Sequence, residues 1–422
     1  FVMKCLKDAT KKTFGRDAKT TELVSNIIEN VKEKGDAELI ALSKQFDGLD
    51  LKSVKVSEEE VKAAYDKVAP EIIESMKKAH ESILFYAKKQ LECLKPLSVD
   101  SPVPGVKLAH RLIPVESIGA YVPGGRYPLP STALMLATPA KVAGVKRIAA
   151  CAPPSKEYGT IHPAMLVAMD IAGVDEIYCV GGAQAIAALT YGTESIKPVD
   201  LICGPGNRFV TEAKRQVLGD VGIDSLAGPS EVLILADETA KAEFVAIDLL
   251  AQSEHDPNAR ATLVTTDEKL AKDVLEKVKE FAGELATGET SLRSWEDNGI
   301  IYIVDSMEEG IAIANDFAPE HLEVQVKNED EVADQLYNFG SLFIGHYAPV
   351  SFGDYCSGTN HTLPTMRTAR YSNGVWVGTF IKTSFVQHIS EEGCRNMAKT
   401  CENLAGIEGL LAHQKSVTIR VK

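Results

Sequence analysis

The spacing of apolar residues changes along the chain, and the change predicts two kinds of structure. From Thr20 to Leu94, apolar residues recur with the 3.6-residue period of amphipathic helices, and Gly35 and Gly48 interrupt the pattern. A transition rich in Pro and Gly follows over residues 96–130. The N-terminal part of the chain is therefore predicted to be helical, and a different architecture is expected after the transition.

After the transition, short apolar runs alternate with helical patterns. The apolar runs predict strands at 145–151, 176–180, 199–203, 231–236, 261–265, 299–304 and 322–326. Helical patterns lie at 163–172, 183–190, 211–216, 242–253 and 267–281. Strand, helix and strand at this spacing indicate βαβ units, which build parallel sheets. A helical stretch from Glu391 and a short strand at 417–421 are predicted at the C-terminal end.

The alternation breaks near Gly228-Pro229 and then resumes, which predicts an α/β protein with two Rossmann-like parallel-sheet domains. The predicted division begins with an N-terminal arm (1–18) and a discontinuous first α/β domain (19–125 and 230–373), whose N-terminal part is helical. A second α/β domain (126–229) lies within the first, and a small C-terminal tail (374–422) ends the chain.

Composition narrows the classes of function. The 422-residue chain has 45 basic and 59 acidic residues, a formal charge of −14 and no block rich in Lys or Arg, which argues against nucleic-acid and membrane-surface binding. No segment looks apolar enough to cross a bilayer or to act as a signal peptide, so we expect a cytoplasmic protein. The eight cysteines form no Cys-x-x-Cys pair, which disfavours a disulfide framework and a structural zinc site.

Glu320 and His321 are adjacent and follow Ala318-Pro319. Their reference pKa values are about 4.3 and 6.5, so a reaction that removes protons from two different atoms could use both. An acidic residue and a histidine after a proline also commonly open a solvated turn or helix. The pair alone does not decide between these interpretations.

Three glycine-rich turns follow predicted strands: Pro123-Gly124-Gly125, Gly181-Gly182-Ala183-Gln184 and Gly204-Pro205-Gly206-Asn207. Glycine at a strand end lets a ligand approach the backbone, and the following helix N-terminus offers N–H groups to a phosphate. None of the turns is a Gly-x-Gly-x-x-Gly motif, and each is explained as a tight turn by itself. Three of them at the carboxyl ends of strands in one sheet favour a dinucleotide crevice of a non-standard kind.

Nitrogen and oxygen donors occur in three separate segments. Gln252 and His255 lie three residues apart near the end of a helical pattern, and this spacing puts both on one face. Asp354 and His361 share a glycine-rich polar loop, and His413 lies near the C-terminal end. Such donors suit a catalytic zinc ion, or manganese or cobalt. Helix caps and core hydrogen bonds are the alternative, and spacing does not show that the three segments meet.

Several long stretches, in this order along the chain, carry a resemblance to a known family. They are Tyr121-Val-Pro-Gly-Gly, Val180-Gly-Gly-Ala-Gln-Ala-Ile-Ala-Ala-Leu, Gly204-Pro-Gly-Asn-Arg-Phe-Val-Thr-Glu-Ala-Lys-Arg, Ala227-Gly-Pro-Ser-Glu-Val-Leu, Gln252-Ser-Glu-His-Asp-Pro, Ala318-Pro-Glu-His-Leu and Gly353-Asp-Tyr-Cys-Ser-Gly-Thr-Asn-His-Thr-Leu-Pro-Thr. With them, the chain resembles the histidinol dehydrogenase family over nearly its whole length. The resemblance implies a zinc-dependent, NAD-linked oxidation of an amino alcohol to an amino acid through an aldehyde.

The resemblance also implies a role for each matching residue. The implied ligands of one zinc ion per subunit are Gln252, His255, Asp354 and His413, and the implied catalytic pair is Glu320 and His321. The implied NAD contacts are Tyr121, Gln184 and Asn207. The implied substrate contacts are Ser230, His361 and Glu408, together with His321 and the zinc ligands. The family is a homodimer whose C-terminal segment crosses to the partner, so His413 and Glu408 would complete the other subunit's site.

The family also contains paralogues that oxidise other primary alcohols, including a sulfopropanediol dehydrogenase. Arg126 and Tyr127 stand where small residues are expected, and an arginine near the substrate, Arg126 or Arg370, would suit a sulfonate or carboxylate. A paired or solvated loop arginine is the simpler explanation of each. Glu408 favours an ammonium-bearing substrate, so we expect oxidation of L-histidinol to L-histidine. Oxidation of 2,3-dihydroxypropanesulfonate to sulfolactate is the alternative, and a non-catalytic metal- or nucleotide-binding protein is a further one.

Overall fold

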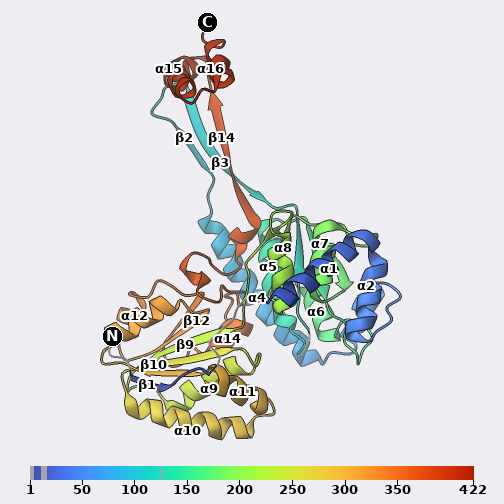
Figure 1. The fold of residues 1–422 in the computed structure, drawn as a ribbon, viewed down its shortest axis with the longest axis vertical. Helices are drawn as coiled ribbons and strands as arrows, with labels where there is room; N and C mark the ends of the chain where they lie inside the picture. Colours follow the sequence, from blue (N-terminus) through green and yellow to red (C-terminus); the bar gives the residue numbers. More distant parts are fainter. Residues whose placement is uncertain (1–3, 11–16, 125–126) are drawn as a thin grey trace.

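The structure is a computed structural model that describes residues 4–10, 17–124 and 127–422. Two α/β bodies lie side by side, and a long antiparallel ribbon carries two helices away from them (Figure 1). The prediction of an α/β fold with two parallel sheets is confirmed. Within the described ranges, no helix combines the length and the apolar character that crossing a membrane requires.

Five parallel strands form the β4–β8 sheet, in the order β6-β5-β4-β7-β8. They are β4 (Ser117–Tyr121), β5 (Arg147–Ala152), β6 (Glu176–Cys179), β7 (Leu201–Cys203) and β8 (Gly222–Ile223). The first strand lies in the centre, and the order of strands reverses between β4 and β7, as in Rossmann-type sheets. One face packs on α5 (Pro130–Ala143) and α6 (Pro163–Ile171), and the other on α7 (Gly182–Tyr191) and α8 (Arg208–Val217).

The β9–β13 sheet has the same strand order and one additional edge strand, β1-β11-β10-β9-β12-β13. The parallel strands are β9 (Glu231–Ala236), β10 (Arg260–Thr265), β11 (Ile300–Ile303), β12 (His321–Gln325) and β13 (Ser341–Ile344), and β1 (Lys4–Lys7) pairs antiparallel with β11. Helices α9 (Ala242–Ser253), α10 (Glu268–Glu284) and α11 (Gly288–Asn298) cover one face. Helices α12 (Met307–Phe317) and α13 (Glu329–Ala333) cover the other.

The helices of the N-terminal region pack on the β4–β8 sheet. Helices α1 (Ala18–Lys34) and α2 (Asp36–Leu42), with the π-turn Ser43–Asp47, lie on the side of α7 and α8, whereas α3 (Glu58–Tyr65) and α4 (Pro70–Cys93) lie on the side of α5 and α6. This differs from the predicted grouping of 19–125 with 230–373. The reason is that β4, which the Pro/Gly-rich transition obscured, is buried between β5 and β7. The domain boundaries themselves remain a prediction.

The third sheet is an antiparallel ribbon that the apolar pattern did not predict. It contains β2 (Leu97–Asp100), β3 (Val106–Pro114) and β14 (Ile381–Ile389), in the order β14-β3-β2. Helices α15 (Glu391–Ile407) and α16 (Leu411–Thr418) follow at its far end (Figure 1). The predicted strand at 417–421 is wrong, because the Ile419 N–H continues the helical pattern to the Lys415 carbonyl and no strand lies alongside in the described chain.

Candidate active site

Glu320 and His321 lie where α12 gives way to β12. Ala318 ends α12 with a left-handed φ of 49°, and Pro319 cannot continue the helix, so the chain turns into the sheet. His321 is the first residue of β12 and lies beside Val232 of β9, at the amino edge of the β9–β13 sheet. Both side chains are buried, with exposed fractions of 6% for Glu320 and 4% for His321. The pair is therefore a buried feature rather than a solvated turn.

The backbone of Glu231 holds both members of the pair. Its N–H donates to Glu320 Oε2 at 2.9 Å, and its carbonyl accepts from His321 Nδ1 at 3.1 Å. A carbonyl only accepts, so the proton of neutral His321 lies on Nδ1 and leaves Nε2 as the basic nitrogen. His321 Nε2 is buried without a hydrogen-bond partner and lies 3.6 Å from Asp354 Oδ1. The backbone contact therefore leaves Nε2 on the side of Asp354 as the nitrogen that can accept a proton.

Glu231 is a residue of this site that the sequence did not single out. Its side chain is 2% exposed, and its Oε1 accepts from the Met366 N–H at 2.9 Å. Met366 has a left-handed φ of 54°, so the carboxyl of Glu231 holds a strained turn against the site. The only signal in the sequence was its position next to Ser230, which is half-buried and whose carbonyl accepts from the Arg260 N–H.

The electrostatics of the pair favour protonation. Burial raises the pKa of Glu320 to about 8. Burial alone would lower the pKa of His321, but the charges of Glu320 and Asp354 outweigh it and raise this pKa to about 9. A cation beside Asp354 would offset the carboxylate charge and lower the pKa of His321 toward the range of a working base.

The raised pKa values predict a pH-dependent stability of the metal-free protein. Glu320 and His321, with ordinary values of 4.5 and 6.5, keep their protons in the folded chain up to about pH 8 and pH 9. The stability from this proton uptake is fully present below the ordinary values and is lost as the pH rises through the raised ones. We therefore expect the melting temperature to fall between about pH 5 and pH 9.

Glu320→Gln should reduce this fall, because it removes one titrating group and the charge that does most to raise the pKa of His321. Differential scanning calorimetry in a buffer series with chelator measures the effect. The matched control is Glu276→Gln on the exposed face of α10, which should leave the pH dependence as it is in the unaltered chain. An equal fall in the Glu320 variant and the unaltered chain would contradict the assignment.

Three of the four predicted metal ligands belong to elements around His321. Gln252 lies in the last turn of α9 and His255 follows two residues after its end, whereas Asp354 lies in α14 (Val350–Tyr355). Burial acts to raise the pKa of Asp354, but His321, His361 and His255 together hold this pKa below its usual value. The structure therefore brings His255, Asp354, His321 and His361 close enough to interact electrostatically.

Gln252 has the feature expected of a side chain that lacks its ligand. It is 2% exposed, and its Nε2 is buried without a hydrogen-bond partner. A flip of the Gln252 side-chain amide exchanges its oxygen and nitrogen. The flip would put Oε1 where Nε2 now has no hydrogen-bond partner. An amide oxygen in this position, with the imidazole of His255 and the carboxylate of Asp354, is the donor set that a borderline cation such as zinc prefers.

His361 connects this region to the other α/β body. Its Nδ1 contacts the Asp354 carbonyl at 3.0 Å, and its Nε2 contacts Thr132 Oγ1 near the start of α5 at 3.2 Å. Asn360 Nδ2 donates to the Met135 carbonyl of the same helix at 2.6 Å. The loop after α14 therefore lies across the boundary between the two bodies.

The remaining predicted residues, Glu408 and His413, lie elsewhere. Glu408 follows α15 and His413 is in α16, both exposed, at the far end of the ribbon from α9 and α14 (Figure 1). In the parts of the chain that the structure describes, no three His, Cys, Asp or Glu side chains form a metal-binding group. One chain therefore does not assemble all four predicted ligands.

The described residues of the three glycine-rich turns lie at the carboxyl edge of the β4–β8 sheet, after β4, β6 and β7. Tyr121 is buried, and its hydroxyl accepts from the Gly182 N–H at 3.0 Å, which brings two of the turns together. Gln184 is also buried, whereas Asn207 is exposed and caps α8 by accepting from the N–H groups of Phe209 and Val210. Gly125 and Arg126 lie outside the described residues.

The turn after β7 requires glycine. Gly204 has a φ of +122°, and a Cβ there would lie 2.2 Å from the Tyr121 carbonyl oxygen. A buried ion pair holds this peptide, since Asp224 Oδ2 accepts from the Gly204 N–H and Lys214 Nζ donates to its carbonyl. The edge of the sheet is therefore rigid and closely packed at the point where a ligand would approach the backbone.

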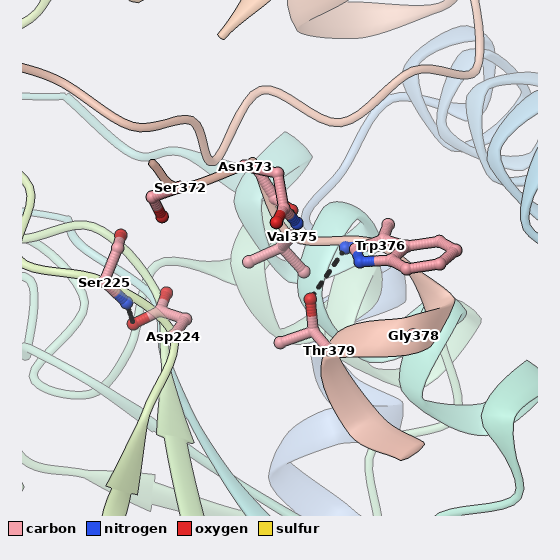
Figure 2. A pocket seen from close by; sticks show the side chains of 9 residues that line it. Asp224, Ser225, Ser372, Asn373, Val375, Trp376, Gly378 and Thr379 are labelled. Atoms are coloured by element: carbon pink, nitrogen blue, oxygen red, sulfur yellow. Dashed lines mark hydrogen bonds between the residues drawn. The ribbon is translucent and has the colours of Figure 1, made fainter. Parts of the chain in front are cut away.

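A cavity of about 250 Å³ lies beside Asp224 (Figure 2). Asp224 and Ser225 line one side, and Figure 2 shows Ser372, Asn373 and Trp376, from the segment that leads into the ribbon, on the other. None of its lining residues is a predicted site residue, so this cavity is distinct from the site around His321.

Comparison with known proteins identifies the family. A family model described as histidinol dehydrogenase matches residues 10–421. The chain belongs to the histidinol dehydrogenase family. Membership makes it an NAD-dependent oxidoreductase, as the resemblance had implied.

Individual relatives agree with this membership. The chain is 46% identical to histidinol dehydrogenase from Methanocaldococcus jannaschii, over 100% of this chain and 99% of the relative. It is 44% identical to the Clostridium acetobutylicum histidinol dehydrogenase, over 96% and 93% of the two chains. The crystal structure of histidinol dehydrogenase from Elizabethkingia anophelis superposes with a TM-score of 0.91 at 38% identity, over 98% and 94% of the chains.

The contacts of Arg370 are relevant to which substrate this member of the histidinol dehydrogenase family could bind. Its Nη2 donates to Asp316 Oδ1 at 2.6 Å and also to the Asp316 carbonyl. The Asp316 carboxylate pairs with Arg367 as well as with Arg370. The guanidinium of Arg370 therefore already has a carboxylate partner within the protein. The simpler explanation of Arg370, a paired loop arginine, therefore agrees with the structure.

Proposed function

We propose that this protein oxidises L-histidinol to L-histidine through L-histidinaldehyde, with reduction of two NAD per turnover, at a zinc site shared between two subunits. The observation that supports it most is the buried His321, whose Nε2 has no partner and faces Asp354, in a member of the histidinol dehydrogenase family. The engaged guanidinium of Arg370 and the names of the relatives favour histidinol over a sulfonate substrate.

Each residue of the catalytic pair has a separate task in this proposal. His321 Nε2 accepts the hydroxyl proton of the alcohol as the carbinol carbon loses a hydride and becomes an aldehyde. Ionised Glu320 then removes a proton from water as the water oxygen bonds to the aldehyde carbon, and protonated His321 returns its proton to the carbonyl oxygen. This gives the neutral hydrate and restores His321 as a base. His321 accepts a hydroxyl proton of the hydrate as the second hydride leaves, and a carboxylic acid results. NAD, when bound, is the acceptor of each hydride.

Gln252, His255 and Asp354 would hold the zinc ion together with His413 from a second copy of the chain. When bound, zinc orients the substrate and offsets the negative charge of the site. The unpartnered amide of Gln252 and the carboxylate character of Asp354 support this set. Ser230 and His361, with Glu408 of the second copy, would contact the substrate.

A homodimer in which the C-terminal segment crosses to the other subunit follows from the same proposal. The ribbon and its helices expose large apolar side chains, among them Phe385 (88%), Ile407 (86%) and Leu411 (68%). Exposed apolar surface on an extended element favours burial against a partner. Because His413 lies far from α9 and α14 of its own chain, this arrangement would supply the fourth ligand to the neighbouring site.

The dinucleotide would lie along the carboxyl edge of the β4–β8 sheet. Tyr121, Gln184 and Asn207 would contact it, which is the position that the topology of a Rossmann-type sheet favours. The positive ends of α7 and α8, which begin at the turns after β6 and β7, suit its phosphates.

Steady-state NADH formation tests the proposal. We expect turnover with L-histidinol and at least about 100-fold lower kcat/KM with 2,3-dihydroxypropanesulfonate, since a site built for polar groups rejects a substrate that leaves them unpaired. A chelator should abolish turnover and zinc should restore it. Faster turnover of the sulfonate would assign the paralogue activity, and zinc binding without NADH formation from either alcohol would indicate a binding protein.

A further inference from the structure

A second group of buried polar side chains lies directly behind the catalytic pair. His321, Glu323 and Gln325 occupy alternate positions of β12 and therefore share one face of the strand. Asp248 precedes Gln252 by one helical turn on α9 and shares its face. Glu323 therefore lies on the same face of β12 as His321, and Asp248 lies on the same face of α9 as Gln252.

Hydrogen bonds join this group across three elements. Glu323 Oε2 accepts from Gln325 Nε2 at 2.9 Å, and the same nitrogen lies 3.3 Å from Asp248 Oδ2. The Gln325 amide therefore joins the carboxyl group of Glu323 on β12 to that of Asp248 on α9. Glu323 Oε1 accepts from the N–H of Val350, the first residue of α14, at 3.2 Å.

We propose that Glu323 and Asp248 are positioning residues that hold α9 and α14 against β12, and thereby set the relative positions of Gln252, Asp354 and His321. The inference rests on the proposed zinc site and adds two residues to it. Neither residue is among the proposed zinc ligands or substrate contacts. They act through the elements that carry the ligands, as hydrogen-bond partners behind a metal site commonly do.

The protonation of the pair suits a fixed link. Burial raises the pKa of Glu323 well above its ordinary value and raises that of Asp248 to about 6. The raised pKa of each carboxyl favours one proton shared by the two neighbouring acids over two adjacent negative charges. With the Val350 N–H and the Gln325 amide, both oxygens of Glu323 have partners. Such a group fixes geometry because its loss would leave buried polar atoms unpaired.

The test is the zinc affinity of the full-length protein, measured by competition with a chromophoric chelator after removal of the metal. Glu323→Leu removes the link to Asp248 and to α14 and should weaken zinc binding by about 10- to 100-fold. Glu323→Gln should retain an affinity close to that of the unaltered chain, because its oxygen still accepts from the Val350 N–H and its amide nitrogen can donate to Gln325 after a flip of that amide, whose Oε1 has no partner in the unaltered chain. Rescue by the amide separates a positioning role from a need for negative charge.

Asp248→Ala provides a second variant in case Glu323→Leu does not fold. Asp248 is only half-buried, and its removal cuts the link to α9 alone, so we expect a loss of zinc affinity of about tenfold. The matched control is Thr262→Val on β10, a fully buried position whose hydroxyl has no partner, which should bind zinc as the unaltered chain does. NAD binding, measured by fluorescence titration, should be unchanged in all variants because the glycine-rich turns belong to the other sheet.

Native zinc affinity in folded Glu323→Leu and Asp248→Ala would overturn the inference, and so would an equal loss in Glu323→Leu and Glu323→Gln. A general loss of stability would lower NAD binding and zinc binding together, and this outcome also contradicts it. Failure of the proposed function is distinguishable, since the unaltered chain itself would then bind no zinc or form no NADH.

Discussion

His321→Ala should lower kcat for both oxidation steps by about two to four orders of magnitude, which is the usual contribution of a general base. The same Nε2 accepts a proton from the alcohol and later from the aldehyde hydrate, so neither step has a substitute for it. NADH formation measured separately from supplied L-histidinol and supplied L-histidinaldehyde should show the same loss. His321→Asn is the matched variant, because its amide can still donate to the Glu231 carbonyl while the Nε2 position is removed.

Glu320→Gln distinguishes the two members of the pair. The amide still fills the buried position beside the Glu231 N–H, but it cannot accept a proton from water. We expect the first oxidation to proceed and the second to slow by about 100-fold or more. Oxidation of supplied aldehyde at the unaltered rate in this variant would assign water activation to another group.

Mixed dimers should regain activity that each parent has lost. His413→Ala removes a proposed ligand in the tail and His321→Ala removes the base in the body, so each homodimer should be inactive. If the tail crosses between subunits, a purified mixed dimer contains one intact site, and we expect about half the activity of the unaltered dimer. Co-expression with two affinity tags and sequential purification gives the mixed species.

The control for this experiment combines two body variants. A mixed dimer of His255→Ala and Asp354→Ala has one defect in each site whichever way the tails cross, and it should stay inactive. Activity in the first mixed dimer and not in the second supports a site completed in trans. An inactive first mixed dimer would mean that His413 serves its own chain or does not bind the metal.

The apolar pattern predicted the buried parallel strands and failed for the ribbon, and the difference has a physical cause. Strand β9 and helix α9 have the predicted bounds, 231–236 and 242–253. Strand β9 is buried on both faces and α9 along one stripe, and such burial leaves a clear pattern of apolar residues in the sequence. Most of β3 and β14 lies away from the cores of the two sheets, apart from end residues such as Ile381, and apolar residues within them, such as Leu108 and Phe385, are exposed. Without burial, no period marks them.

The candidate site was predictable where side-chain type carries the information. The adjacency of Glu320 and His321 and the spacing of Gln252 and His255 are visible in the sequence and point to chemistry there. Glu231 was not predictable, because it acts on the pair through its backbone, and that depends on the register of β9 with β12. Glu323 was not predictable for the same reason, since its importance depends on α14 lying against β12.

The two sheets present opposite edges to each other, the carboxyl edge of β4–β8 and the amino edge of β9–β13, joined by the short segment 224–230. The residues proposed to hold the aldehyde and those proposed to hold the dinucleotide therefore belong to different bodies. On the proposed function, NADH would leave and NAD would enter at one body while the aldehyde stays at the other. In a four-electron oxidation, the aldehyde must stay bound while NADH is exchanged for NAD, and two separate bodies allow both.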